Sequence, residues 1–500
     1  MTSDYQNPQF LSLLPDLTGE AGAECEIILP DYCPNVLRIL QTTARPILRS
    51  EQTTGNRITV DGCVEYRVLY LAEDGSGMKS VTQQGQFSYA AELPEGTEDT
   101  QVILQVRSVS ARALNPKKIF VRSSVAITVR SCKSVMIKTP SLPQPCEVLV
   151  RREQGMRRVG SAKKPLRIAD EFENDSGRII GEILQWNIAF RETERKPLSD
   201  KLIVKGDMIS ELLCTNRDGA IIPIRKIFPI SQILDLPDLT EGACFCTEFS
   251  LISASFLPRE ESPEGNQTVA YDVEIDVRAD AYESAEFCRT EDAYGLRTDL
   301  DCKNDVISVD CIYPIDECGT VRETVETGIC GEILRIDVTP ELKSTRFDKE
   351  GDRIVCEGGW ECRILMTDTD GIPCAVIREI PFILHLPAND CTEPVRNDTR
   401  LMLSDLSWTR LDAERVELTG TYRWNGVLFH RKKRTMLTEV SVSGDRKRSE
   451  EAVILYYAAT GESAWDIAKE HACCYDDFLK QNRLEDDRIA EDRMLMILSC

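Results

Sequence analysis

A stripe of alternating residues occurs three times in this chain, and each copy holds a glycine at the same place. The glycines are Gly62, Gly206 and Gly358, and mostly apolar side chains stand at every second position around them. Such period-two alternation puts one set of side chains on one face of a β-strand. A glycine inside a strand indicates a bulge or a close approach of neighbouring backbone. The sequence therefore predicts three related strands, each with the same local irregularity.

The residues that follow each stripe also repeat. An Asp-Gly pair comes first, and Asp-Gly supplies the positive φ that tight hairpins need. A short apolar run ending in Leu-Pro comes next, and its proline lies 32, 31 and 29 residues after the stripe glycine in the three copies. The Asp-Gly pair and the Leu-Pro pair follow the stripe at nearly the same distance in all three copies. This recurrence indicates internal repeats of one structural unit. The pairs are Asp74-Gly75, Asp218-Gly219 and Asp370-Gly371, followed by Leu93-Pro94, Leu236-Pro237 and Leu386-Pro387.

Each copy ends with two more strand candidates. Short strands with Gly, Pro and Asp between them are typical of a β-sandwich or a partly closed barrel. We therefore expect a mainly β fold with three sandwich-like or barrel-like repeats, at 27–140, 178–289 and 306–440, after an N-terminal segment, 1–26. The candidates are 102–109 and 121–129 in the first repeat, 244–256 and 269–277 in the second, and 401–408 and 416–424 in the third.

The segments between the repeats differ in character. The first, 141–177, is a basic connector with seven basic residues between positions 151 and 167. Such a run favours the solvated face of an edge strand, where lysine and arginine discourage edge-to-edge aggregation; a phosphate-binding patch is the alternative. The second, 290–305, is interpreted as an acidic linker, and the third, 441–451, as a flexible tether. The basic residues are Arg151, Arg152, Arg157, Arg158, Lys163, Lys164 and Arg167.

The pattern changes from period two to helical after Ala452. A short strand at 453–457 precedes Ser463, which stands three residues before Asp466, as in a capping box at a helix start. A second helix is predicted over 475–481, with Asn482 as its left-handed cap, and 494–498 makes a closing strand. We therefore expect a small βααβ domain over residues 452–500, with Trp465 in its core.

Charge and cysteine content restrict the partners and the compartment. The chain has 60 basic and 83 acidic residues and a net charge of −23, which argues against a nucleic acid or an anionic membrane as the main partner. The sequence contains neither a secretory signal nor an apolar run of about 18 residues, so we expect a cytoplasmic protein without an integral membrane segment. The 20 cysteines should then be mostly reduced thiols; late oxidative cross-linking is the alternative.

Motifs that carry chemistry are scarce. The cysteines form no C-x-x-C pair and the chain has three histidines, so we expect no metal site. The sequence also lacks a P-loop, a G-x-S-x-G nucleophile elbow and an H-E-x-x-H motif. Ser161 and Lys164 match the loose S-x-x-K spacing by chance, without companion motifs. We therefore expect a protein that is not an enzyme, with no catalytic residue and no cofactor.

The C-terminal domain resembles a LysM module, whose helix start reads Gly-Asp-Thr-Leu-Trp-x-Ile-Ala. LysM modules usually bind glycans that contain N-acetylglucosamine, in a groove between the loop before the first helix and the loop after the second. The resemblance implies a ligand groove with Gly461, Glu462, Ser463 and Ala464 on one wall and Asn482, Leu484 and Ile489 on the other. The matching residues are Gly461-Glu462-Ser463-Ala464-Trp465-Asp466-Ile467-Ala468 and Asn482-Arg483-Leu484.

This module departs from the LysM pattern in two places and in its charge. Asp492 stands where the family usually has glycine, and Leu498 replaces the usual terminal proline. Residues 451–500 hold eleven acidic and five basic side chains. A protein ligand therefore fits a cytosolic chain better than a glycan, and both ligand classes stay open.

The start of the first repeat resembles the opening of SPOCS-domain proteins, and so does the segment 182–186 that leads into the second stripe. SPOCS repeats followed by a C-terminal LysM module are the layout of SipL-type spore coat morphogenetic proteins, and the resemblance covers residues 27–440 and 452–499. The residues of the opening are Leu29-Pro30-Asp31-Tyr32-Cys33-Pro34-Asn35-Val36-Leu37-Arg38-Ile39-Leu40.

This resemblance implies a non-enzymatic adaptor or scaffold in spore coat assembly. Such a protein works in the mother-cell cytoplasm, at the forespore surface and spore coat, and its LysM module holds a coat morphogenetic ATPase beside other coat proteins. The rival hypothesis is a cell-wall or cortex protein that binds peptidoglycan through the same module. A third is a general envelope scaffold in a cell that does not sporulate.

Overall fold

The structure is a computed structural model, and its fold is mainly β, as the sequence predicts. It describes residues 9–136, 140–216, 218–240, 242–260, 267–347, 353–387, 394–446 and 453–498. Six-stranded units follow one another along the chain with the same strand order in each. In every unit the second, third and fourth strands form one antiparallel sheet, and the last strand lies between the first and the fifth in a second sheet.

The first sheet of each unit contains the glycine stripe as its central strand. In unit 1 it consists of β3 (Val36–Thr54), β4 (Arg57–Ala72) and β5 (Met78–Glu92). In unit 2 it consists of β9 (Glu182–Leu198), β10 (Lys201–Thr215) and β11 (Ile221–Asp235). In unit 3 it consists of β15 (Ile333–Phe347), β16 (Arg353–Thr367) and β17 (Pro373–Pro387).

The second sheet of each unit includes both strand candidates predicted at the end of the repeat. In unit 1 it consists of β2 (Leu17–Ile28), β6 (Asp99–Asn115) and β7 (Lys118–Met136), with β1 (Gln9–Leu13) continuing along β7. In unit 2 it consists of β8 (Cys146–Glu173), β12 (Cys244–Pro258) and β13 (Thr268–Gly295). In unit 3 it consists of β14 (Thr298–Glu326), β18 (Pro394–Arg410) and β19 (Arg415–Asp445).

Each unit has its own hydrophobic core between its two sheets, so the units are sandwiches. In unit 1 the alternating side chains of β4, such as Val64 and Tyr66, meet those of β7, such as Val125 and Ile127. The corresponding strands supply the cores of units 2 and 3. Each fully buried aliphatic side chain contributes roughly 1.5–3 kcal/mol, so one such core gives a unit substantial burial of its own.

The stripe glycines mark the same structural irregularity in all three units, as predicted. An added Cβ at Gly62, Gly206 or Gly358 would lie 2.7, 2.5 or 2.2 Å from a carbonyl oxygen of the neighbouring strand. The pairing register shifts beside each of these glycines, which is the mark of a β-bulge. Glycine is required here because the bulged strand comes too close for any side chain.

The Asp-Gly turns also occupy the same place in each unit. They join the third strand of the unit to the fourth, and their glycines, Gly75, Gly219 and Gly371, have φ of 77°, 82° and 77°. A positive φ is the conformation that Asp-Gly supplies in tight hairpins. The predicted hairpins are therefore confirmed.

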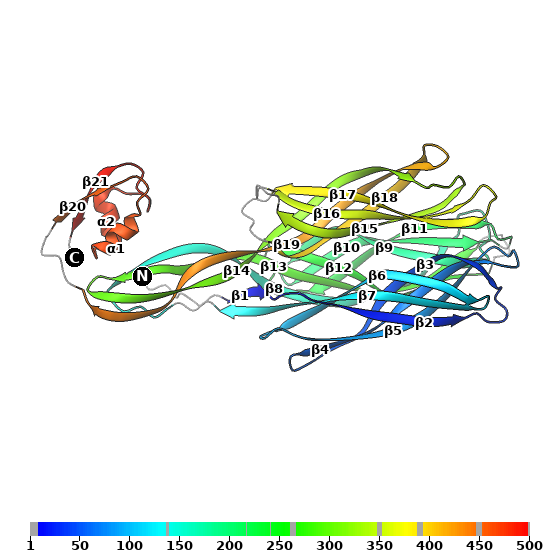
Figure 1. Cartoon of the computed structure of the whole chain (residues 1–500), viewed down its shortest axis with the longest axis horizontal. Coiled ribbons are helices and arrows are strands. Elements are labelled where there is room, and N and C mark those ends of the chain that lie inside the picture. Colours follow the sequence, from blue (N-terminus) through cyan, green and yellow to red (C-terminus); the bar gives the residue numbers. More distant parts are fainter. Residues whose placement is uncertain are drawn as a thin grey trace.

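The first and last strands of units 2 and 3 continue beyond the sandwiches as two-stranded ribbons. β13 pairs with β8 from Thr268 opposite Glu173 to Gly295 opposite Cys146, and β14 pairs with β19 over a similar length. Figure 1 shows the sandwiches gathered at one end of the molecule and these ribbons projecting from them. We call the projecting part, formed by the two ribbons, the stalk.

The stalk corrects the interpretation of the segments between the repeats. Most of the basic segment 141–177 is β8, which is an edge strand. This agrees with the favoured interpretation of the segment as part of an edge strand. The predicted acidic linker 290–305 is wrong, because 290–295 ends β13 and 298–305 begins β14. Residues 441–445 of the predicted tether belong to β19, and 447–451 lie outside the described residues. The polar composition of 290–305 misled the prediction because Tyr294 and Leu296 pack against the C-terminal domain, which is distant in the sequence.

Five of the seven basic residues of the segment 151–167 are paired with acidic residues of the adjacent strand β13. Lys163 lies 2.8 Å from Asp276, Arg167 lies 2.6 Å from Asp272, and Arg157 pairs with Glu283. Cross-strand pairs of opposite charge stabilise a sheet modestly. This pairing leaves little free charge for the phosphate-binding patch that was the alternative interpretation of the segment.

The base of the stalk joins the three units. Phe10 of β1 meets Phe287 of β13 with ring centroids 4.5 Å apart, and Tyr282 of β13 meets Phe429 of β19 at 5.2 Å. Asp310 of β14 accepts a buried hydrogen bond from the amide of Leu13, at 2.7 Å, and also pairs with Arg431. The units are therefore held to one another by apolar clusters and by charged hydrogen bonds.

The close approach at the stripe glycine predicts a large cost for adding one methyl group. We expect Gly358→Ala to lower the free energy of unfolding by about 1–3 kcal/mol, because the new Cβ overpacks a bulge that backbone encloses. The measurement is urea unfolding followed by tryptophan fluorescence, since Trp360 lies in the same core. Gly444→Ala is the control, because nothing lies within 4 Å of its added Cβ. Equal losses in the two variants would contradict the account.

His430 of β19 makes stability depend on pH. It is 4 % exposed, and burial, with a smaller effect of Lys432, lowers its pKa from 6.5 to about 4. Below pH 6.5 the unfolded chain takes up a proton that the folded chain does not, so stability falls as the pH falls from 6.5 toward 4. The protonation of this histidine in the unfolded chain should lower the free energy of unfolding by about 2 kcal/mol between pH 7.5 and pH 5.

We expect His430→Gln to lose less stability than the wild type over that pH interval. The measurement is the difference in urea midpoint between pH 7.5 and pH 5 for each protein. The other titrating groups are common to both proteins and cancel in the comparison. Parallel pH dependences would show that His430 is protonated in the folded state.

Candidate functional site

The C-terminal module consists of a two-stranded sheet and two short helices. Its elements are β20 (Val453–Ala458), α1 (Ala464–Glu470), α2 (Tyr475–Asn482) and β21 (Arg493–Leu498), in the order that the sequence predicts. Ser463 caps α1, and its hydroxyl accepts a hydrogen bond from the amide of Asp466 at 3.2 Å. The two strands pair antiparallel from Val453 opposite Leu498 to Ala458 opposite Arg493.

The two loops that were expected to form the walls of a groove are hydrogen-bonded to each other. The amide of Gly461 donates to the carbonyl of Ile489 at 2.8 Å, and the amide of Ile489 donates to the carbonyl of Glu462 at 2.9 Å. The amide of Ala464 donates to the carbonyl of Asp487 at 2.6 Å. These backbone groups are therefore already satisfied within the module.

The candidate groove residues have different surroundings. Ala464 and Ile489 are buried in the core of the module, and Leu484 packs against it. Gly461 is exposed, and Glu462 and Ser463 are half-buried. The structure thus brings the two predicted walls together. Of the first wall, only the segment 461–463 lies at the surface.

Asn482 has a structural role that the sequence did not predict. Its side-chain amide donates to the carbonyls of Phe478 and Met496, at 2.9 and 2.8 Å, and its side-chain oxygen accepts from the amide of Met496 at 2.7 Å. The predicted left-handed cap is wrong by one residue, because Asn482 ends α2 and Arg483 has the left-handed conformation, with φ of 54°. An asparagine offers both donors and an acceptor, and here they fasten α2 to β21.

Asp487 organises the start of α1, although no motif drew attention to it. Its carboxylate accepts hydrogen bonds from the amide of Trp465 at 3.0 Å and from the hydroxyl of Tyr475 at 3.1 Å. Arg151 of β8 lies 3.6 Å from the same carboxylate. A carboxylate at a helix start is favoured by the helix dipole, and this one also links the module to the stalk.

The module is docked on the tip of the stalk. Asp292 of β13 accepts a hydrogen bond from the indole nitrogen of Trp465 at 2.8 Å, and it forms an ion pair with Lys469 at 2.6 Å. The hydroxyl of Tyr294 donates to the carbonyl of Cys473 at 2.7 Å, and its ring lies 4.9 Å from that of Trp465. Trp465 is buried, as predicted, but part of what buries it belongs to the stalk. Hydrogen bonds to charged groups are worth about 1.5–3 kcal/mol each, so Asp292 is central to this contact.

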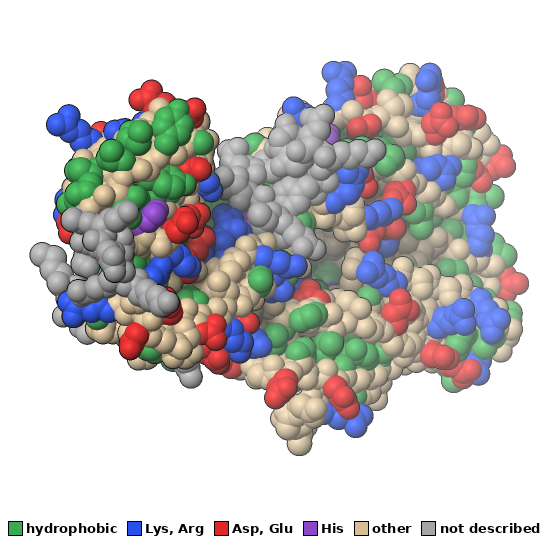
Figure 2. All heavy atoms as spheres, turned by 60° about the vertical axis from the view of Figure 1, so that its left-hand side comes forward, with side chains coloured by type: hydrophobic (Ala, Val, Ile, Leu, Met, Phe, Trp, Pro, Cys, Tyr) green, Lys and Arg blue, Asp and Glu red, His purple; other side chains and the backbone are tan. Residues whose placement is uncertain are grey.

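The sheet of the module presents an apolar face to solvent. Six side chains on alternate positions of its two strands are 37–68 % exposed, and cross-strand partners such as Leu455 and Met496 stand opposite each other. Figure 2 shows hydrophobic side chains gathered on the module. Exposed apolar patches of this kind mark interaction sites. The six residues, which we call the apolar face, are Val453, Leu455, Tyr457, Met494, Met496 and Leu498.

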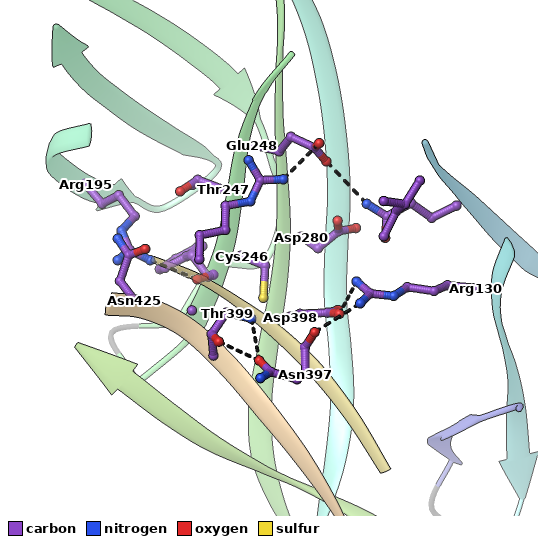
Figure 3. A pocket seen from close by; sticks show the side chains of 15 residues that line it. Arg130, Arg195, Cys246, Thr247, Glu248, Asp280, Asn397, Asp398, Thr399 and Asn425 are labelled. Carbon is purple, nitrogen blue, oxygen red and sulfur yellow. Dashed lines mark hydrogen bonds and ion pairs between the residues drawn. The ribbon is translucent and has the colours of Figure 1, made fainter. Parts of the chain in front are cut away.

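A cavity of about 220 Å³ lies where the three units meet, and Figure 3 shows the side chains that line it. We call it the junction cavity. Arg130 of unit 1 pairs with Asp398 of unit 3, and Arg400 of unit 3 lies 2.8 Å from Glu248 of unit 2. Burial raises the pKa of Asp398, while Arg130 acts in the opposite direction. The charges in this cavity therefore pair across unit boundaries and hold the units together.

The thiol in the junction cavity is poorly suited to nucleophilic chemistry. Burial raises the pKa of Cys246 well above its ordinary value of 9.0, and the thiolate rather than the thiol is the nucleophile. All the cysteines within the described ranges are free thiols. In that same part of the chain no group of three or more His, Cys, Asp or Glu side chains is arranged to hold a metal ion. None of the helices described there has the length and apolarity to cross a membrane.

Comparison with known families identifies one segment of the chain. Residues 35–112 match the family model described as SipL, SPOCS domain. This match supports a SipL-type protein. The matched residues cover β3, β4, β5 and most of β6, and the corresponding strands recur in the same order in units 2 and 3. No curated protein matches the chain.

The contact between stalk and module predicts the effect of removing one carboxylate. We expect Asp292→Ala to speed amide hydrogen exchange in α1 and in residues 286–295 by at least tenfold, because Trp465 and Lys469 lose their shared partner. Hydrogen exchange of the full chain, read by mass spectrometry, is the measurement. Asp301→Ala removes an exposed carboxylate from the neighbouring strand β14 and should leave both segments unchanged. Unchanged exchange in Asp292→Ala would contradict a docked module.

Proposed function

We propose that this chain is a non-enzymatic scaffold of bacterial spore coat assembly, in the mother-cell cytoplasm at the forespore surface. The observation that carries the proposal is the match of residues 35–112 to the SipL, SPOCS domain family. The resemblance of the C-terminal module to LysM supports the same layout. In this proposal the module engages a coat morphogenetic ATPase, and the three sandwiches contact other coat proteins.

The apolar face of the module supports a protein as its ligand. Leu455 and Tyr457 are 68 % and 64 % exposed, and they lie beside methionines of the paired strand. Aromatic and methionine side chains are enriched in protein interfaces. The stalk contacts Trp465 and Lys469 of α1, so the apolar face is left for a partner.

The charge of the module indicates the kind of protein surface that fits it. Residues 451–500 contain eleven acidic and five basic side chains. Complementary charge steers association and disfavours wrong partners. We therefore propose that the ATPase presents an apolar surface with lysine or arginine around it.

Peptidoglycan is the rival ligand, and the loops of the module argue against it. A glycan groove needs free polar groups on both walls, whereas Gly461, Ala464 and Ile489 use their amides within the module. The side-chain amide of Asn482 is likewise hydrogen-bonded to the carbonyls of Phe478 and Met496. These contacts favour the protein ligand over N-acetylglucosamine.

The proposal predicts that a charge on the apolar face weakens binding to the ATPase. We expect Leu455→Lys to weaken binding about 30-fold or more, as for a residue worth 2 kcal/mol or more at the centre of an interface. The measurement is titration of the full chain with the purified ATPase, beside a pull-down with insoluble peptidoglycan. Gln481→Lys adds the same charge at an exposed position of α2 and should bind like the wild type.

Two outcomes would contradict this function. Retention of the full chain on peptidoglycan with no affinity for the ATPase would make the rival ligand correct. Equal binding by Leu455→Lys and the wild type would remove the apolar face from the interface. Circular dichroism of both variants verifies that the fold is intact.

A further inference from the structure

A second cavity lies between the three units, and arginine dominates its charge. Its volume is about 390 Å³, and strands of all three units line it. Four arginines and two acidic residues line it, and we call it the arginine pocket. The arginines are Arg45 of β3, Arg67 of β4, Arg335 of β15 and Arg363 of β16, and the acidic residues are Glu65 and Asp337.

Three buried donors of this pocket have no acceptor among the residues that the structure describes. They are the side-chain amide nitrogen of Gln185, Nε of Arg45 and Nη1 of Arg335. Gln185 is only 4 % exposed, so water from the bulk does not satisfy its amide. Buried polar groups are normally hydrogen-bonded, and unsatisfied ones call for an explanation. The side chains that carry these donors line the cavity, so an acceptor bound there is the explanation that the titration below tests.

The arginines of the pocket also repel one another. Burial lowers the pKa of Arg67 from 12.5 to about 10; Glu65 opposes this effect, and Arg45 and Arg335 add to it. The guanidinium of Arg67 lies 4.1 Å from the ring centre of Trp186, and that of Arg45 lies 5.8 Å from it. A bound anion would relieve the repulsion between these positive charges.

The acidic residues near the pocket do not cancel its charge. Asp337 pairs with Arg335 at 2.7 Å, and Glu65 lies 3.4 Å from Arg45 and 3.8 Å from Arg67. Glu361 pairs with Arg363, which leaves two carboxylates for the other three arginines. The junction cavity of Figure 3 differs, because Arg130 and Arg400 there each have a carboxylate of their own, whereas Arg45 and Arg67 share Glu65. Arg130 and Arg400 thus pair with carboxylates across unit boundaries, whereas the arginine pocket keeps an excess of positive charge.

We propose that the arginine pocket binds a small organic anion through a phosphate or carboxylate group. The planar fork of a guanidinium matches both groups bidentately. The volume lies in the range of about 300–1,000 Å³ typical of ligand sites and exceeds what a bare phosphate ion fills. Phe190 and Phe249, whose rings stack 5.7 Å apart, also line the pocket and give an apolar part of the ligand a surface to contact.

Binding at this place ties the units together. Arg45 and Arg67 belong to unit 1, Arg335 and Arg363 to unit 3, and Gln185 and Trp186 to unit 2. A ligand that binds only the assembled pocket stabilises the folded chain by mass action. The anion therefore acts as a clamp on the sandwiches, and this role is independent of what the module binds.

The test is calorimetric titration of the full chain with three probes at constant ionic strength. Pyrophosphate tests the phosphate group, citrate tests carboxylates, and phenyl phosphate tests whether an apolar ring adds affinity. We expect at least one probe to bind with one site per chain. Arg335→Gln should weaken that binding at least tenfold, and the same probe should raise the thermal midpoint of the wild type but not of the variant.

Two variants keep the test decisive. Arg363→Gln changes a more exposed arginine, with 33 % of its side chain accessible, and serves if Arg335→Gln fails to fold. Arg167→Gln removes an arginine that is 70 % exposed on β8, and it should bind like the wild type. Equal weakening by Arg167→Gln would mean nonspecific attraction to surface charge. That result, or no binding of any probe at about 10 mM (a Kd weaker than millimolar), would overturn the proposal.

Discussion

The last strand of each unit hydrogen-bonds to the strand that begins the unit, and the remainder of the architecture depends on this pairing. In units 2 and 3 the pair runs past its sandwich, so β8 with β13 and β14 with β19 become the stalk. A two-stranded ribbon alone is marginally stable in water. The apolar clusters around Phe287 and Phe429 give these ribbons the burial that they lack alone.

The stalk gives the C-terminal module a fixed position, which matters for the proposed scaffold. Asp292 and Tyr294 bind the module through Trp465, Lys469 and the carbonyl of Cys473. A fixed module loses less conformational entropy when it binds than a loosely tethered one. In the proposed scaffold, the sandwiches and the apolar face therefore meet their partners at a set distance from each other.

Local patterns in the sequence predicted the central strands and hairpins of the units and the order of elements in the module. They did not predict the first strand of each unit, since β2 begins inside the predicted N-terminal segment 1–26 and β8 lies in the predicted connector 141–177. The stripe glycines and the Asp-Gly turns are local constraints of backbone geometry, and they recur in the structure where the alternation placed them. The linker predicted at 290–305 failed because the partners that bury its residues are distant in the sequence: Tyr294 and Leu296 pack in the core of the C-terminal module. The arginine pocket had no local signal, since Arg45 and Arg335 come from distant units. Asp292 was missed for the same reason, because its partners lie more than 170 residues away.

The central claim is that units and module form one connected body, and zero-length carbodiimide cross-linking of the full chain tests it most directly. The account predicts two cross-links across boundaries: Lys469 to Asp292, 2.6 Å apart, and Lys79 of unit 1 to Glu182 of unit 2, 2.8 Å apart. Lys205 and Glu194, 2.7 Å apart inside unit 2, provide the reference yield. Comparable yields at all three pairs would agree with the account. A reference cross-link without the two boundary cross-links would contradict it.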